Sequence, residues 1–191
     1  MQFRGFALLI ACALGVLGAQ TRVVLETGQG AIEVELADAR APITTANFLR
    51  YLDGGFYDGG RFHRTVTMDN QPNNNTRIEA IQGGPTAERA QQGFPPIALE
   101  RTSQTGLSHK DGVISMARFA PDSATSDFFI CIGDQPSLDF GGMRNPDGQG
   151  FAAFGHVVKG MDVVRKIQKS PAEGQRLTPP VTIVKARRAA P

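Results

Sequence analysis

The fold class is decided by residues 23–36, which read VVLETGQGAIEVEL. Val23 to Leu25 form a short apolar run, and Thr27 to Gly30 supply turn residues. From Ala31 to Leu36, apolar side chains at every second position alternate with two glutamates. This period of two is typical of a strand with one buried face. The stretch therefore predicts a strand, a tight turn and a second strand.

Further strands and two helices are predicted along the rest of the chain. Ala41-Pro42 ends the second strand, and Thr44 or Thr45 can cap a helix that Gly54-Gly55 ends. A second, amphipathic helix spans 161–168 with Val164 and Ile167 inward. Polar loops are expected at 69–77 and 141–150, and strands near 62–66, 78–82, 97–100, 113–116, 128–132, 152–158 and 181–186. Many short strands with two helices, no internal repeat and no linker favour an antiparallel barrel or sandwich.

The first nineteen residues differ from the rest. Arg4 gives a short positive start, and the uncharged apolar run that follows ends in small residues before Gln20. This pattern is typical of a secretory signal peptide at 1–19, followed by one domain at 20–191. Two alternatives remain open. The segment can stay uncleaved as an anchor, or Leu9-Ile10-Ala11-Cys12 can act as a lipoprotein box, although the apolar stretch before Cys12 is short for lipidation.

Composition narrows the classes of partner and cofactor. The 191 residues are 41% apolar and 20% charged, with a formal net charge of +2, and fit one soluble globular domain. No basic stripe with interleaved aromatic residues suggests nucleic acid, and Arg187-Arg188 is interpreted as a solvated tail. His109 and His156 lack paired ligand spacing, so no metal or other cofactor is expected. Cys131, the one cysteine left after cleavage at residue 19, is predicted to be an inert core thiol.

Four short motifs carry the strongest functional signal. They are Phe62-His63-Arg64, Gln82-Gly83-Gly84, Ser115-Met116-Ala117 and Asp127-Phe128-Phe129-Ile130. In this order they resemble the active-site strands of the cyclophilins, the cyclosporin-binding class of peptidyl-prolyl cis/trans isomerases. The resemblance runs from about residue 22 to 186. It implies a mainly β fold, a closed eight-stranded antiparallel β-barrel capped by two α-helices, and prolyl isomerase activity.

The chemistry of that reaction suits an arginine. Amide resonance opposes rotation about an X-Pro bond with a barrier of about 18–20 kcal/mol. In the twisted state the prolyl nitrogen regains a lone pair and accepts a hydrogen bond better, so a donor that bonds it there accelerates rotation. The resemblance makes Arg64 the catalytic residue, because a guanidinium offers several donors and keeps its proton. A surface salt-bridge partner is the alternative role for Arg64.

The resemblance also implies a set of substrate-binding residues. Gln82 matches the glutamine that bonds the substrate backbone, and Phe129 and Leu138 match walls of the proline pocket. Ala117 matches the position that lines the channel for the residue before proline, and Phe62 supports the strand. The full set of predicted substrate-binding residues is Phe62, Gln82, Met116, Ala117, Phe129, Leu138 and Phe151.

Several positions depart from the family pattern. Ser137 stands where a tryptophan is common, so weak binding of cyclosporin-type drugs is expected with activity retained. Glu79 and Ala80 replace an apolar phenylalanine-methionine pair. Either Glu79 turns toward Arg64 or solvent, or the insert after Arg64 shifts the strand register and supplies another wall, with Met68 as a candidate. Asp127 and Arg118 replace uncharged amides near the groove.

These observations leave three functional hypotheses. The first is a periplasmic or secreted, monomeric prolyl isomerase that acts on Pro-containing segments of exported polypeptides and assists their folding. The second is a non-catalytic cyclophilin-like module that binds such segments as a chaperone or adaptor. The third is a structural β-barrel lipoprotein anchored through Cys12. Keeping both Arg64 and Gln82 favours the first.

Overall fold

The computed structural model describes residues 20–190, so the predicted signal peptide at 1–19 and Cys12 lie outside the described residues. Within 20–190 one sheet contains all the named strands. These are β1 (Arg22–Thr27), β2 (Gly30–Leu36), β3 (Arg61–Val66), β4 (Ala80–Gly84), β5 (Val113–Met116), β6 (Phe128–Cys131), β7 (Ala153–Lys159), β8 (Ala172–Glu173) and β9 (Arg176–Arg188).

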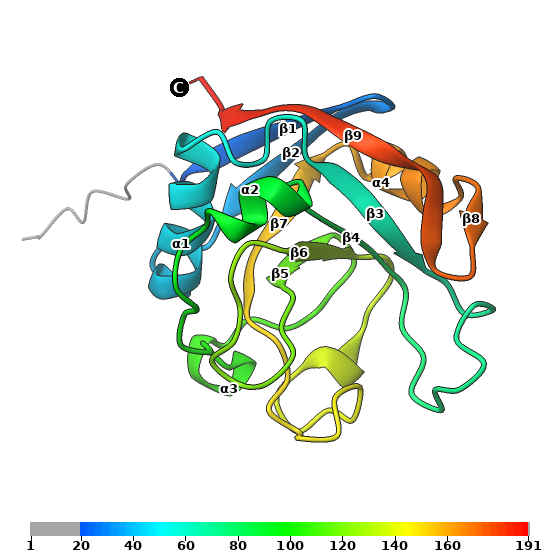
Figure 1. Ribbon diagram of the computed structural model, residues 1–191. Helices are drawn as coiled ribbons and strands as arrows, with labels where there is room; N and C mark the ends of the chain where they lie inside the picture. The colour runs from blue at the N-terminus through cyan, green and yellow to red at the C-terminus, as the bar shows by residue number, and fades with distance from the viewer. Residues whose placement is uncertain (1–19, 191) are drawn as a thin grey trace, which may run out of the picture.

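The sheet closes on itself into a barrel. Its strands follow the order β1-β2-β7-β5-β6-β4-β3-β9, and β9 pairs back with β1, every neighbour being antiparallel. Figure 1 shows β1 and β9 side by side although they come from opposite ends of the described chain. The two-residue β8 is only a short hairpin arm on β9. The predicted eight-stranded antiparallel barrel is therefore confirmed.

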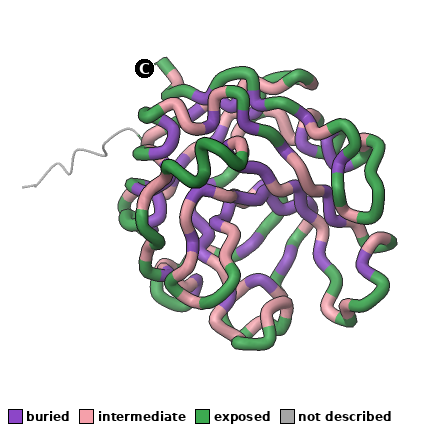
Figure 2. The backbone as a smooth tube through the Cα atoms, viewed as in Figure 1, coloured by how far each residue is buried: buried purple, intermediate pink, exposed green. Residues whose placement is uncertain are grey.

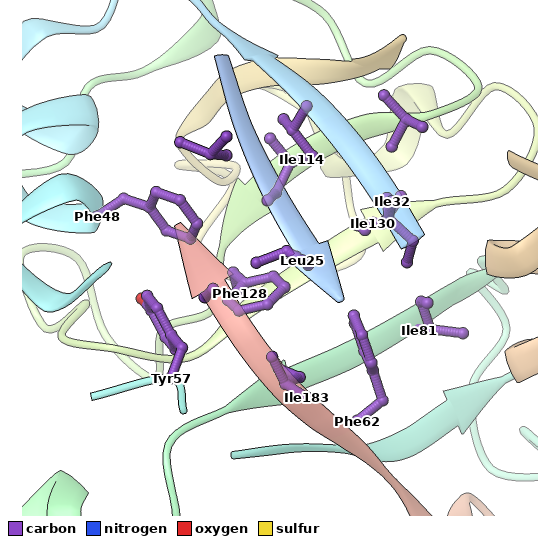
Figure 3. Close-up of a cluster of buried hydrophobic side chains, with 14 of the residues drawn as sticks. Leu25, Ile32, Phe48, Tyr57, Phe62, Ile81, Ile114, Phe128, Ile130 and Ile183 are labelled. Carbon is purple, nitrogen blue, oxygen red and sulfur yellow. The ribbon is translucent and has the colours of Figure 1, made fainter. Parts of the chain in front are cut away.

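The apolar residues of β2 face the core, as the alternating sequence pattern predicts. Ile32, Val34 and Leu36 are buried in the barrel, while the intervening glutamates are partly exposed. Figure 3 shows Phe48, Tyr57, Phe62 and Phe128 gathered inside it with aliphatic residues of several strands. Figure 2 shows the same arrangement along the whole described chain, with buried residues toward the centre and exposed residues in the outer turns and loops.

The two predicted helices are present, and two shorter ones accompany them. Helix α1 (Pro42–Asp53) buries Phe48 against the barrel, and α4 (Met161–Gln168) buries Val164 and Ile167, as its pattern predicts. Two unpredicted short helices, α2 (Ala87–Gln91) and α3 (Thr102–Thr105), lie in the long connection between β4 and β5. A 3-10 turn, η1 (Pro136–Leu138), follows β6.

The start of α1 differs from its prediction. The helix begins at Pro42 after Ala41, so the predicted capping residues Thr44 and Thr45 lie inside it and are buried. The carboxylate of Glu100 caps the helix instead. It accepts hydrogen bonds from Ile43 N at 3.1 Å and from Thr44 N at 2.7 Å. A residue more than fifty positions away thus satisfies the free amides of the first turn.

Two further predictions are wrong. Residues 97–100 form no strand, because pairing there is limited to one bridge between Ile97 and Ala124. Arg187-Arg188 is no free tail. It ends β9, and the two guanidiniums pair with Glu26 at 2.9 Å and Asp53 at 2.8 Å. In residues 20–190, no helix has the length and apolar character needed to cross a membrane.

Candidate active site

A bulge in β3 brings Arg64 out of the barrel. Residues two apart on a strand normally point to the same face. The pairing of β3 with β4 and β9 shifts register between Phe62 and Arg64, so that rule is broken here. Phe62 is fully buried in the core, whereas the Arg64 guanidinium reaches an outer cavity.

Glutamine side chains hold the Arg64 guanidinium. Its Nε and Nη2 donate to Gln175 Oε1 at 2.9 and 2.6 Å, and its Nη1 donates to Gln82 Oε1 at 2.9 Å. These bonds use three of the five N–H donors and leave two for another acceptor. Partial burial lowers the pKa of Arg64, but a guanidinium stays charged at any physiological pH.

The cavity beside Arg64 is largely apolar at its base. It has a volume of about 390 Å³ and contacts a second buried cluster outside the main core. The rings of Phe129 and Phe151 meet edge to face with centroids 5.5 Å apart, and Leu138 lies in the same cluster. The apolar wall consists of Val66, Ile78, Ala80, Ala117, Phe129, Leu138 and Phe151.

Most of the predicted site residues meet at this cavity. Arg64 lines it together with Gln82, Ala117, Phe129, Leu138 and Phe151, although they come from β3, β4, β6 and the two connections that flank β6. Their roles toward substrate stay predictions.

Phe62 and Met116 are corrections to the predicted set. Their exposed fractions are 0% and 1%, and both belong to the barrel core. Neither lines the cavity. The period of two explains this for Met116, because the neighbouring Ala117 faces the cavity. These two side chains pack into the barrel core and support the strands.

The walls that replace the missing phenylalanine-methionine pair were not predicted. Ile78 and Val66 line the cavity next to Ala80, while Met68 does not and is 47% exposed. Glu79 points away from Arg64 and accepts a hydrogen bond from Gln168 Nε2 at 3.1 Å. Beyond the bulge, β3 pairs regularly with β4, with Arg64 opposite Gln82 and Val66 opposite Ala80.

Two other site residues escaped sequence reasoning. Gln175 lies in the turn between β8 and β9 and meets Arg64 only because β9 pairs with β3. Arg144 lies in the 141–150 loop and also lines the cavity. A single glutamine or arginine in a loop has no sequence pattern around it that predicts a place in the cavity.

Two further charged residues, Arg118 and Asp127, line the cavity. Arg118 donates to both oxygens of Asp147 at 2.7 and 2.9 Å, so this guanidinium has a counterion. Asp127 accepts from Gln82 Nε2 at 3.3 Å and lies 3.6 Å from His63 Nε2. Burial raises the pKa of Asp127, an effect that His63 and Gln82 oppose.

The arrangement can bind a small apolar ring and direct hydrogen bonds at the polar atoms beside it. The apolar wall takes the ring, and Arg64 and Gln82 offer the donors at its edge. Among residues 20–190 no group of three or more histidine, cysteine or acidic side chains could hold a metal ion.

Comparison with known proteins agrees with this geometry. A family model described as "Cyclophilin type peptidyl-prolyl cis-trans isomerase/CLD" matches residues 22–188. The peptidyl-prolyl cis-trans isomerase of Acinetobacter baylyi is 38% identical over 80% of this chain and 74% of the relative. Peptidyl-prolyl cis-trans isomerase B of Escherichia coli is 36% identical over 76% of this chain and 83% of the relative.

A solved structure supports the fold independently. The Cryptosporidium parvum cyclophilin type peptidyl-prolyl cis-trans isomerase superposes with a TM-score of 0.72 over 90% of this chain and 99% of that one. At 20% sequence identity this likeness concerns the fold alone. Together with the family match over nearly all of the described residues, it places this chain among the cyclophilin-type peptidyl-prolyl cis-trans isomerases.

Proposed function

We propose that this isomerase acts on X-Pro bonds of exported polypeptides and that Arg64 is its catalytic residue. The observation that carries the assignment is the guanidinium of Arg64, fixed by two glutamines at the edge of an apolar cavity. The cavity holds the pyrrolidine ring of a Pro-containing segment while the rest of the amide rotates.

The rate gain comes from hydrogen bonds that strengthen in the twisted state. A free Arg64 N–H donates to the prolyl nitrogen once that nitrogen regains its lone pair. Gln82 fixes the substrate backbone. Each 1.4 kcal/mol removed from the barrier accelerates rotation about tenfold, so a few aligned bonds suffice. No nucleophile or general base is required.

The proposed setting is the periplasm or the exterior of the cell. Its support is the signal-peptide pattern of residues 1–19, and a lipid anchor at Cys12 is disfavoured by the short apolar stretch before it. The mass of the purified mature protein distinguishes an N-terminus near Gln20 from one carrying lipid at Cys12. We propose further that the protein is a monomer and binds cyclosporin-type drugs weakly, because Ser137 replaces a tryptophan.

The test is cis-to-trans exchange of an Ala-Pro peptide measured by NMR without a coupled protease. Mature protein is compared with Arg64→Ala and Arg64→Lys. Acceleration that falls at least about a hundredfold in both variants is expected, because lysine keeps the charge but loses the planar fork of donors. Arg165→Lys, a solvent-facing arginine paired with Asp111, is the matched control and should leave the rate unchanged.

Two outcomes contradict the proposal. An Arg64→Ala protein as fast as the parent shows that another group drives rotation. Binding of the peptide without any acceleration by the parent favours the Pro-segment binder over the enzyme.

A further inference from the structure

A second guanidinium shares the cavity of Arg64. Arg144 lines it, half-buried, and comes from the 141–150 loop. Its Nη1 donates to Gln71 Oε1 at 2.7 Å and to the Thr76 carbonyl at 2.8 Å, both in the Asn-rich segment 69–77. Both loops lie at the lower end of the barrel in Figure 1. Arg144 thus joins two long loops and is fixed in place by them.

Gln71, which accepts the hydrogen bond from Arg144, is itself held in place by further hydrogen bonds. Gln71 is only 3% exposed, and its amide is fully engaged. Its Nε2 donates to the carbonyls of Thr67 at 2.7 Å and Ile78 at 2.8 Å, while its Oε1 also accepts from Ile78 N at 3.2 Å. The position of Arg144 therefore depends on a buried hydrogen-bond network and not on a mobile surface side chain.

Neither guanidinium has a counterion within residues 20–190. Arg64 bonds two glutamines, and Arg144 bonds a glutamine and a peptide carbonyl, so every acceptor is neutral. By contrast Arg118, the third arginine of the cavity, is paired with Asp147. The one lining carboxylate, Asp127, is engaged with Gln82 and His63. Arg64 and Arg144 line the same cavity, and both burial and the charge of Arg64 lower the pKa of Arg144.

Two partly desolvated cations facing one cavity are unfavourable unless an anion joins them. Both hydrogen bonds of the Arg144 guanidinium to the protein are donated by Nη1. Its Nε and Nη2 have no acceptor among the described residues. These donors are free for a ligand that enters the cavity. A carboxylate suits them best, because it accepts two parallel bonds from a guanidinium.

We propose that Arg144 is a specificity-determining residue that binds a carboxylate next to the proline of the substrate. The inference rests on the isomerase function and on the ring lying against Phe129 and Leu138. The carboxylate has two possible sources with the same chemistry. It is either the side chain of an acidic residue directly after proline or the C-terminal carboxylate of a chain that ends in proline.

The experiment compares matched peptides by NMR exchange at low salt. One pair is Ala-Ala-Pro-Glu-amide against Ala-Ala-Pro-Gln-amide, and the other is Ala-Ala-Pro with a free against an amidated C-terminus. In the parent, kcat/KM for at least one acidic member should exceed that of its neutral partner about tenfold. The pair that discriminates identifies the source of the carboxylate.

Variants assign the preference to one residue. Arg144→Gln should bring the ratio of kcat/KM for the acidic peptide to that for its neutral partner close to one in both pairs, whatever its effect on the neutral peptides themselves. Arg144→Lys should keep part of the preference, because a cation remains without the fork. Arg77→Gln is the matched control, since Arg77 belongs to the same insert and bonds the Met68 carbonyl but does not line the cavity. It should behave as the parent does.

Because Arg144→Gln could loosen the two loops, a second measurement uses NMR titration of the parent protein. The Nε–H signal of Arg144, assigned from Arg144→Lys, should shift when the discriminated acidic peptide is added and stay still with its neutral partner. Equal kcat/KM within both peptide pairs overturns the proposal, as does a preference that survives in Arg144→Gln. Either result leaves the isomerase assignment intact, because the neutral peptides still report it.

Discussion

At the scale of single residues, the orientation of Arg64 depends on Gln175. Both the Nε and Nη2 bonds of the guanidinium end on Gln175 Oε1, and Gln175 Nε2 is itself anchored on the Asn70 carbonyl at 3.0 Å. Gln175→Ala frees the guanidinium to rotate, so kcat should fall about tenfold while KM changes little. NMR exchange kinetics measure this, with the exposed Gln92→Ala as control. An unchanged kcat would mean that Gln82 alone suffices to fix Arg64.

The second prediction for single residues concerns Asp139, which is hydrogen-bonded to the buried His109. Burial by itself would raise the pKa of Asp139. The hydrogen bonds from His109 Nδ1 at 2.7 Å and His109 N at 3.0 Å outweigh this effect, so its pKa lies below the usual value. A carboxyl whose pKa is lowered by folding stabilises the fold above the unfolded pKa of about 3.9. That contribution is lost as pH falls through the lower folded pKa.

The measurable consequence is a pH-dependent gap between two proteins. Asp139→Asn should unfold at a lower urea concentration than the parent at pH 7, and the gap should shrink as pH falls from about 5 to 3. Urea titrations at several pH values give the gap directly. A gap that is constant over this range would mean that packing, and not the carboxylate charge, causes the loss.

At the scale of elements, Glu100 makes the start of α1 depend on a distant loop. Its carboxylate accepts from two main-chain amides and from Thr44 Oγ1 at 2.6 Å. Glu100→Ala leaves these first-turn amides without a cap and should lower the free energy of unfolding by about 1–2 kcal/mol. Chemical denaturation measures it, with the exposed Glu173→Ala as control. Equal losses in both variants would rule out a specific cap.

Helix α1 shows which features of the fold could be predicted from the sequence and which could not. Elements with a clear period were predicted well. The alternation in Ile32, Val34 and Leu36 and the inward spacing of Val164 and Ile167 depend only on neighbours along the chain. The start of α1 was missed because its cap comes from Glu100. The predicted strand at 97–100 is absent because Ile97 and Leu99 pack in a loop that has no partner strand beyond one bridge to Ala124.

The candidate site divides along the same line. Motif order placed Arg64, Gln82 and Phe129 at one cavity. It could not show that the β3 bulge separates Phe62 from Arg64, since a bulge is a property of strand pairing. Gln175 and Arg144 reach the cavity only through β9 pairing and contact between two loops. Such long-range partners leave no local pattern.

At the scale of the whole molecule, the last strand closes the barrel. β9 pairs with both β1 and β3 and buries Val181, Ile183 and Ala186. Without its second half, β1 would expose an open edge and the core would lose one wall. Its arginines also pair with Glu26 and Asp53, so the end of the chain is tied to both β1 and α1.

Truncation tests this closure. A mature chain ending at residue 180 should lose cooperative thermal unfolding and bind a hydrophobic dye, because the barrel cannot close and apolar surface stays exposed. A chain ending at residue 189 keeps every pair of β9 with β1 and should melt as the parent does. Circular dichroism melting curves distinguish the two cases. A cooperative transition at the parent temperature in the shorter chain would mean that the rest of the domain folds without closure of the barrel by the second half of β9.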